Sequence, residues 1–407
     1  MTCFTHTFPN GLRLIHLPSD SPVAYCGFAV NAGARDEDPG EYGLAHFVEH
    51  LLFKGTARRK ARHILNRMDS VGAELNAYTT KEDTFVYSVF MEEHFGRAFE
   101  LLTDIVFRST FPPAEIEKEI NVIRDEIETY NDNPSELIFD EFEDLLFCGH
   151  PLGHNILGNE DSLRSFTSAA GLDFTRRFYL PCNMVFFSMG RFRPEKILRL
   201  AEEAWNGSCS PVPLHRRTPP PVLPAQNKCL SKETHQTHLI LGGTAYSMYE
   251  DDRKRIALFL LNSLLGGGMN SRLNLALREK HGLTYGVESN LTAYTDTGLA
   301  SIYFGTDAKH VGKALHLVGK ELSRVCETRL STSQLAALKK QVKGQMALSA
   351  DNRETLFLFL GKQFLHHDRY ETLPEVFAKI ERISAGEILE VANEVFAPAR
   401  LSGLTYD

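Results

Sequence analysis

The chain contains Gly43-Leu44-Ala45-His46-Phe47-Val48-Glu49-His50-Leu51-Leu52-Phe53, an apolar segment that carries two histidines and one glutamate. In an α-helix, positions three and four apart lie on one face. His46, Glu49 and His50 therefore converge on one patch of a helix that is otherwise apolar and predicted to be buried on most sides. Buried polar groups need partners. A divalent metal is a partner that fits two imidazoles one turn apart.

A metal at this patch needs a third protein ligand, because zinc takes at least three and keeps one position open for water. The stretch from Pro113 to Asn131 predicts a strongly acidic helix that begins with proline in its first turn. Glu126 is its best candidate ligand. Glu119 lies two turns earlier on the same face, about 10 Å away along the axis. One carboxylate can reach the metal while the other stands near the rim.

Glu49 is better suited to the role of general base than to that of ligand. A metal lowers the pKa of its bound water towards about 7, and a carboxylate beside that water can take the remaining proton. It then returns the proton to the leaving amine. The motif therefore predicts peptide hydrolysis by metal-activated water without a covalent intermediate.

The composition excludes several classes of protein. The 407 residues are 43% hydrophobic, and the net charge of −8 is spread along the chain, which argues against a nucleic-acid partner. No run of about 18 apolar residues predicts a membrane span. The N-terminus does not resemble a secretory signal or a transit peptide. Seven scattered cysteines without a Cys-x-x-Cys pair predict reduced thiols and a cytoplasmic protein.

The order of expected elements indicates two domains. Residues 207–224 are rich in proline and lack periodicity, which predicts a linker between domains 1–206 and 225–407. After it, the succession of strand, turn, strand and long helix seen from residue 72 recurs with an offset of about 215 residues. Ala77-Tyr78-Thr79 and Ala293-Tyr294-Thr295 occupy similar places in this order. We interpret this as an internal duplication of an α+β domain.

The motif His46 to His50, together with its flanking residues from Gly43 to Thr56, resembles the insulinase/pitrilysin family of zinc metallopeptidases. The inverted zincin motif of that family is His-x-x-Glu-His. Within the family it is most similar to bacterial relatives of mitochondrial processing peptidase. Four further segments agree in the same order along the chain: Gly72 to Thr79, Glu119 to Ile127, Leu265 to Leu273, and Arg278 to Tyr285.

The resemblance implies a role for each matching residue. It places one Zn2+ per chain on His46, His50 and Glu126, with Glu119 as a supporting glutamate. It implies that Arg278 and Tyr285 bind substrate carbonyls and stabilise the oxyanion. The strand with Asn76 and Ala77 would receive the substrate as an added strand. The loop Gly266-Gly267-Gly268 would guide substrate.

The resemblance also implies a fold. Each of two similar α+β domains would have a mainly antiparallel sheet with helices packed on one face. Two such two-domain halves form a clamshell in the family, and this chain holds one half. It is therefore expected to pair with a second copy or a paralogue, and to enclose unfolded peptides or presequence-like segments.

Alternative readings concern three features. The whole chain could be a non-catalytic scaffold, like the core subunits of the respiratory cytochrome bc complex, although such relatives usually lose ligand residues. The segment Cys148 to His154 has the residue types of a second metal site, but the resemblance places no metal there. His366-His367 is expected to be a solvated helix end.

Overall fold

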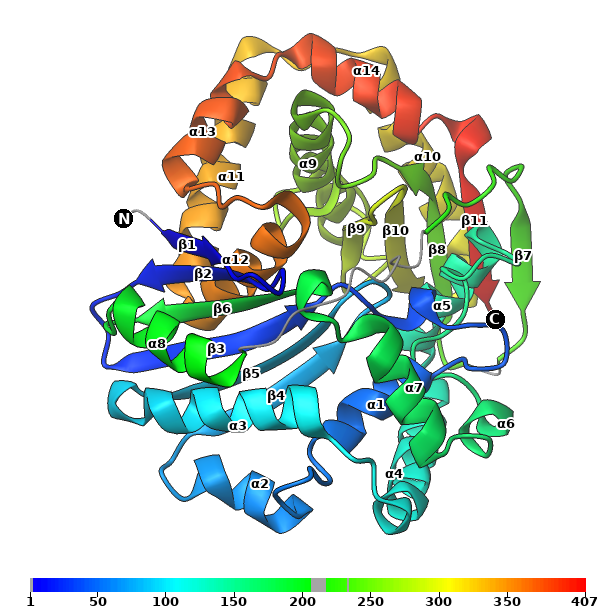
Figure 1. Ribbon diagram of the computed structural model, residues 1–407. Helices are drawn as coiled ribbons and strands as arrows, with labels where there is room; N and C mark the ends of the chain where they lie inside the picture. Colours follow the sequence, from blue (N-terminus) through cyan, green and yellow to red (C-terminus); the bar gives the residue numbers. More distant parts are fainter. Residues whose placement is uncertain (1–2, 206–216, 233) are drawn as a thin grey trace. The chain divides into compact units, whose positions relative to one another are not determined.

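The computed structural model describes residues 3–205, 217–232 and 234–407, which form two compact units (Figure 1). The first unit comprises the described residues of Met1–Glu128, His154–Arg216 and Ser349–Tyr370, and the second those of Thr129–Gly153, Arg217–Leu348 and Glu371–Asp407. Each unit thus takes a segment from the other half of the sequence, unlike the predicted division into 1–206 and 225–407. Residues 207–216 of the predicted linker lie outside the described residues, and 217–224 contain no helix or strand.

The first unit is built on one six-stranded sheet in the order β1-β2-β6-β3-β5-β4, in which only the β2–β6 pair is parallel. Its strands are β1 (Phe4–Thr7), β2 (Arg13–Pro18), β3 (Val23–Val30), β4 (Glu74–Thr79), β5 (Thr84–Met91) and β6 (Met184–Gly190). Its helices are α1 (Leu44–Leu52), α2 (Ala61–Asp69), α3 (Phe95–Arg108), most of α4 (Pro113–Asn131), α6 (Glu160–Leu163), α7 (Ser168–Phe178), α8 (Pro194–Ala204) and α12 (Arg353–His367).

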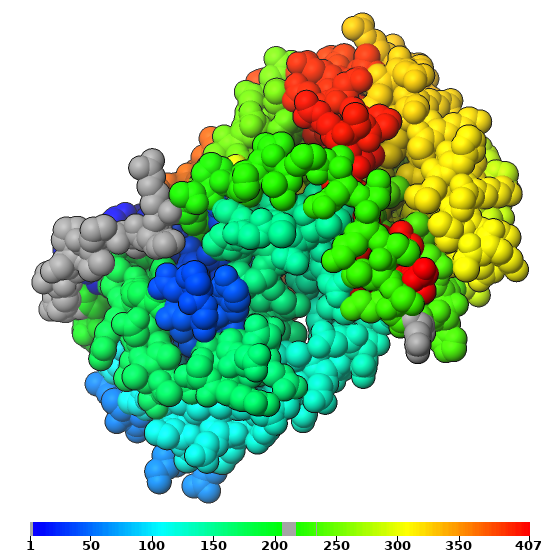
Figure 2. Space-filling model, turned by 90° about the vertical axis from the view of Figure 1, so that its right-hand side faces the viewer, coloured from blue at the N-terminus to red at the C-terminus, as the bar shows by residue number. Residues whose placement is uncertain are grey.

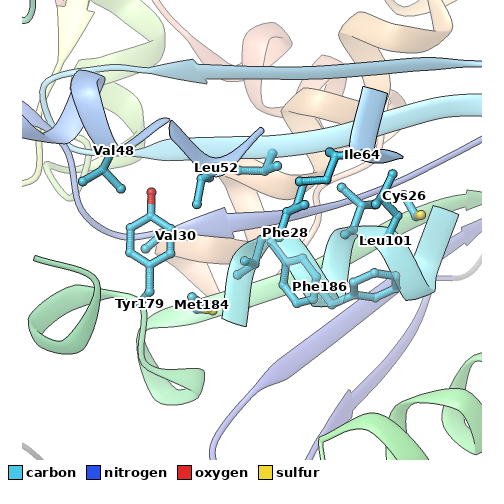
Figure 3. Packing of buried hydrophobic residues seen from close by; sticks show 14 of the residues in the cluster. Cys26, Phe28, Val30, Val48, Leu52, Ile64, Leu101, Tyr179, Met184 and Phe186 are labelled. Carbon is cyan, nitrogen blue, oxygen red and sulfur yellow. The ribbon is translucent and has the colours of Figure 1, made fainter. Parts of the chain in front are cut away.

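Both faces of this sheet are buried. Successive side chains of a strand point to opposite faces, so one strand can pack against helices on both sides. In β3, Cys26, Phe28 and Val30 pack with residues of α1, α3 and α8 in the main core, as Figure 3 shows in part. Tyr25 and Ala29 of the same strand pack on α12 instead. Figure 1 shows α3 and α12 on opposite sides of the sheet.

The second unit is built on a five-stranded sheet in the order β7-β11-β8-β10-β9, in which only the β7–β11 pair is parallel. Its strands are β7 (Asn227–Leu230), β8 (Thr237–Ala245), β9 (Val287–Ala293), β10 (Gly298–Thr306) and β11 (Ser402–Tyr406). Its helices are α5 (Pro134–Leu146), α9 (Asp252–Gly266), α10 (Val311–Glu327), most of α11 (Thr332–Asp351), α13 (Leu373–Arg382), α14 (Ala385–Val395) and a π-helix at Asn274–Glu279.

The predicted duplication is confirmed at the level of topology. Strands β7 to β11 reproduce the order and the directions of β2, β3, β4, β5 and β6. The matching Ala-Tyr-Thr tripeptides, however, are not equivalent. The hairpin β4–β5 pairs Thr79 with Thr84, and the hairpin β9–β10 pairs Ala293 with Gly298. Thr79 therefore corresponds to Ala293, so the tripeptides are two residues out of register.

The predicted pair of α+β domains with mainly antiparallel sheets is confirmed, with one correction to the helix packing. Each sheet also has a helix on its second face, and that helix comes from the other half of the sequence. Helix α12 covers the first sheet, with Phe357 and Leu360 buried against Phe187. Helix α5 covers the second sheet through Ile138 and Phe142. The sequence pattern could not reveal this exchange, because it shows that a helix is apolar but not which sheet it covers.

Among the described residues, no helix is both long and apolar enough to cross a lipid bilayer.

Candidate metal centre

Helix α1 carries both histidines, and close packing fixes its start. Gly43 precedes the helix with φ +96°, a conformation that favours glycine. A Cβ at Gly43 would lie 2.7 Å from the carbonyl oxygen of Leu157. The buried carboxylate of Glu37 accepts hydrogen bonds from the backbone N–H groups of Gly43 (2.9 Å) and Ala45 (2.7 Å). These bonds satisfy donors that a helix start leaves unpaired.

The loop that supplies Glu37 is itself held in place. Figure 2 shows this loop in blue, bordered by green segments that follow residue 150. The hydroxyl of Ser162 donates to the backbone carbonyl of Tyr42, and Arg177 pairs with Asp38 at 2.7 Å. These contacts fix the direction in which α1 enters the core.

The predicted ligands converge. One ligand atom each of His46, His50 and Glu126 lies within 4.8 Å of the other two, and this is the one group of three or more candidate ligands found among the described residues. Glu126 Oε1 is 3.9 Å from His46 Nε2, and Oε2 is 3.7 Å from His50 Nε2. Both distances are too long for a hydrogen bond.

These distances fit a zinc ion. Around tetrahedral zinc with ligand bonds of 2.0–2.1 Å, neighbouring ligand atoms lie roughly 3.4 Å apart. His46 supports the same reading, because burial and the nearby His50 lower its pKa to about 3. Its imidazole is therefore neutral near pH 7, as metal binding requires. The three side chains are chemically and spatially suited to hold zinc.

Glu49 lies on the same helix between the two histidines and is 8% exposed. The hydroxyl of Thr79, at the end of β4, donates a 2.7 Å hydrogen bond to Glu49 Oε2. Burial raises the pKa of Glu49, and the Thr79 hydrogen bond partly opposes this. A raised pKa makes this carboxylate a better proton acceptor at neutral pH.

Glu119 does not stand near the rim, as the sequence suggested, but lies buried behind His50. Its Oε1 is 3.0 Å from His50 Nδ1, and its Oε2 is 2.7 Å from Lys54 Nζ. A hydrogen bond at Nδ1 leaves Nε2, the atom that faces Glu126, as the ligand atom. Glu119 therefore contacts the back of the candidate ligand His50 and lies outside the group of three ligand atoms.

Sequence reasoning missed three residues around these ligands: Glu37, Lys54 and Thr79. A signal exists for Lys54, which follows His50 by four residues and so continues its helical face. Thr79 is the last residue of the strand that the resemblance predicts to receive the substrate. For Glu37 the sequence offers no signal, because its contacts depend on how a loop folds back onto α1.

The two residues expected to bind substrate lie on β4, which is an edge strand of the sheet. Asn76 pairs with Tyr87 and Ala77 with Val86 of β5. On the other side of β4, no strand of the described chain is paired with it. An edge strand offers main-chain groups to which an extended peptide can bind.

The glycine loop of the second unit has an explanation in packing. A Cβ at Gly266 would lie 2.5 Å from Ser289, and one at Gly267 would lie 2.7 Å from the carbonyl oxygen of Ser263. A Cβ at Gly268 would meet nothing closer than 3.7 Å, but its φ of +144° is one that other residues rarely adopt. Close packing at Gly266 and Gly267 and the positive φ of Gly268 therefore account for all three glycines, whatever role the loop has towards substrate.

Arg278 and Tyr285 both lie at the surface of the second unit. Arg278 is near the end of the π-helix, with its Nε 3.7 Å from Glu279. Tyr285 is 88% exposed, which is unusual for a large aromatic side chain. Gly282 lies between them with φ +58°. Both side chains are thus accessible to a ligand.

The expectation for His366 was wrong. Its side chain is 2% exposed and its Nε2 is 2.7 Å from Asp83 Oδ1. The other candidate histidine, His154, stacks on Tyr42 and bonds through Nε2 to Glu37 at 2.9 Å. Cys148 and His154 do not form part of a group of three candidate ligands among the described residues.

Comparison with known proteins identifies the family. The family model of the insulinase family (peptidase family M16) matches residues 14–160, and a second model, described as the peptidase M16 inactive domain, matches residues 165–342. An uncharacterised zinc protease of Bacillus subtilis is 32% identical over 394 residues, which cover 96% of this chain and 95% of that protein. The chain belongs to the insulinase family of peptidases.

Two further proteins extend the comparison. The mitochondrial-processing peptidase subunit beta of Bos taurus is 32% identical over 400 residues, covering 95% of this chain and 80% of that protein. A protease from Helicobacter pylori has a similar fold, with a TM-score of 0.90 at 20% identity over 100% of this chain and 99% of that one. The predicted resemblance to the insulinase family is therefore confirmed.

Proposed function

We propose that the protein is a zinc metalloendopeptidase that hydrolyses unfolded peptides or presequence-like segments. The observation that carries the proposal is the convergence of His46, His50 and Glu126 beside a buried Glu49. Relatives named zinc proteases, at about 32% identity over nearly the whole chain, support it.

Each of these side chains has a different role in the proposed reaction. Zinc, when bound by His46, His50 and Glu126, would lower the pKa of a water molecule and polarise the scissile carbonyl. Glu49 would accept a proton from the attacking water at a carboxylate oxygen and deliver it to the leaving amine. Arg278 and Tyr285 would stabilise the developing oxyanion.

The substitution Glu49→Gln tests the proposed base. It keeps the size of the side chain and removes the proton acceptor. We expect hydrolysis of a quenched fluorescent peptide to fall by at least about 10²-fold, while zinc content stays near one ion per chain. Full activity in this variant would show that Glu49 is not the base.

Metal content decides between the enzyme and the rival function, a non-catalytic scaffold. We expect zinc in the purified chain, its loss in Glu126→Gln, and no change in Glu128→Gln, an exposed neighbour on the same helix. The scaffold predicts no stoichiometric zinc in any of the three proteins. The scaffold would be supported by a metal-free wild-type chain that also fails to bind added zinc.

We further propose that two copies of this chain, or this chain and a paralogue, form a closed chamber that admits unfolded peptides. Peptide would add as a strand along β4 near Asn76 and Ala77, while Gly266-Gly267-Gly268 guides it. Light scattering of the pure, active protein should give twice the chain mass of 45.8 kDa. Full activity in a strictly monomeric protein would contradict the two-chain chamber.

A further inference from the structure

The turn Thr80-Lys81-Glu82-Asp83 joins β4 to β5 and follows directly after Thr79. Three successive residues of this turn are charged, and all three are buried: Lys81 is 4% exposed, Glu82 3% and Asp83 1%. Hairpin turns are normally polar and solvated. Burying a charge costs several kcal/mol unless the charge is paired. The three buried charges of this turn therefore require partners of opposite charge or hydrogen-bonding groups.

Each charged residue contacts a different part of the first unit. Glu82 Oε1 accepts a 2.5 Å hydrogen bond from Arg35, whose side chain is equally buried. Asp83 contacts α12 twice, at 2.7 Å from His366 Nε2 and 3.4 Å from Lys362 Nζ. Lys81 Nζ donates to the backbone carbonyl of His154 at 2.5 Å. The turn is thus fixed by three segments that are distant in sequence.

The main chain of the turn is fixed as well. The backbone N–H of Ala34 donates to the carbonyl of Thr80 at 3.1 Å, and that of Arg35 donates to Lys81 at 2.7 Å. The same short loop continues to Glu37, which caps the start of α1. One assembly therefore holds both the metal-binding helix and the strand end that carries Thr79.

The duplicated fold supplies an internal comparison. The equivalent turn of the second unit is Tyr294-Thr295-Asp296-Thr297, between β9 and β10. It has one charged residue instead of three, and only Tyr294 is buried. The equivalent helix, α9, contains no histidine or glutamate. The buried charged turn therefore occurs only in the unit that has the metal ligands.

Ion pairs of this kind are weak evidence for stability, because apolar residues of similar volume often stabilise as well or better. A buried charged turn departs from the usual pattern of solvated hairpin turns, and such departures are expected at functional sites. What the three charged side chains do provide is a fixed position for the end of β4. That end holds the Thr79 hydroxyl 2.7 Å from Glu49.

We propose that the turn Thr80–Asp83 is a positioning element of the active site, which holds Thr79 against Glu49 and sets the register of the edge strand β4. The inference rests on the proposed peptidase function. Asp83, Glu82 and their partners act through Thr79 and β4 and do not touch the substrate. Removing a contact on the α12 side should therefore impair catalysis without removing the metal.

The substitution His366→Leu tests this, since it removes the closer of the two α12 partners of Asp83 and leaves Lys362 in place. We expect kcat to fall on the order of 10- to 100-fold, as for a small displacement of a catalytic group, with KM within about twofold and zinc content unchanged. His366→Gln, which retains a donor, should restore most of the activity. The matched control is His16→Asn, because His16 is a buried histidine of the same unit that bonds to Ser188 instead.

A double-mutant cycle asks whether the effect passes through Thr79. Thr79→Val should lower kcat, and Thr79→Ser should not. If the turn acts through Thr79, His366→Leu should cost little more in the Thr79→Val background. Simple additivity of the two losses, or an equal loss of kcat in the His16→Asn control, would overturn the proposal.

Hydrogen exchange gives a readout that does not depend on activity. In His366→Leu, the backbone amides of Glu74–Thr79 should exchange at least about tenfold faster, while those of β2 and β6 remain protected. Unchanged exchange in β4 would overturn the positioning role. An inactive, zinc-free wild type would instead contradict the proposed function, and the exchange experiment would still decide about the turn.

Discussion

Two buried histidines of the first unit, His46 and His16, have similar burial but different surroundings. Burial lowers the pKa of both, to about 3 for His46 and about 4 for His16. His46 has a second histidine four residues later and a carboxylate 3.9 Å away. His16 is fully buried and bonds to Ser188 on the neighbouring strand. The surroundings of His46 suit a metal ion, whereas the hydrogen bond to Ser188 gives the imidazole of His16 a partner inside the core.

The lowered pKa of His16 predicts a loss of stability in mild acid. Its folded-state pKa of about 4 lies below the unfolded value of 6.5, so the unfolded chain binds the proton first as the pH falls. The contribution is complete above about pH 6.5 and is lost progressively down to about pH 4, by about 3 kcal/mol in total. Denaturant unfolding of His16→Asn at several pH values should show a shallower pH dependence than the wild type. Identical slopes would contradict this account.

At the scale of elements, the site depends on where α1 begins. The helix starts at a glycine with φ +96° whose Cα faces the backbone of Leu157 and Gly158. The two histidines follow within the next seven residues, so a displacement of this start moves both. The helix itself was predictable from its apolar pattern, whereas the contact at its start depends on a segment more than one hundred residues away.

The substitution Gly43→Ala should therefore damage both stability and metal binding. Alanine is disfavoured at positive φ, and its Cβ would lie 2.7 Å from the Leu157 oxygen. We expect a loss of about 2–4 kcal/mol in unfolding free energy and weaker zinc binding. Thermal unfolding and zinc competition would measure the two effects.

Gly96→Ala is the matched control. Gly96 lies inside α3, and a Cβ there meets nothing within 4 Å. It should be neutral or stabilise by about 0.5–1 kcal/mol, because alanine is the better helix former. Equal losses in both variants would show that the close contact at Gly43 does not matter.

At the scale of the whole molecule, neither unit is a continuous piece of the chain. The second face of the first sheet is covered by α12, which lies more than 150 residues after the last strand of that sheet. The second sheet is covered in the same way by α5. The equivalent helices of the two repeats are therefore exchanged between the two units.

The exchange predicts that residues 1–206, the domain predicted from sequence, cannot fold properly alone. Without α12 they would expose the apolar face formed by Ile15, Leu17, Tyr25, Ala29, Phe85, Val185 and Phe187. An exposed patch of this kind favours aggregation. We expect the fragment to aggregate or bind a hydrophobic dye, and to lack a cooperative thermal transition. The same fragment with residues 349–370 attached by a flexible linker should recover that transition, and a cooperative, dye-free fragment without them would contradict the prediction.

The sequence by itself predicted the candidate metal ligands and determined the two α+β repeats and the family. His46, Glu49 and His50 lie within one helical turn, where local geometry alone brings side chains together. Glu126 could be named because its helix is recognisable, although its approach to the histidines is a tertiary fact. Only the tertiary structure decided that Glu119 lies behind His50, that Thr79 bonds to Glu49 and that a buried charged turn holds them. These contacts join segments far apart in the chain, and no periodicity in the sequence encodes which buried charge meets which partner.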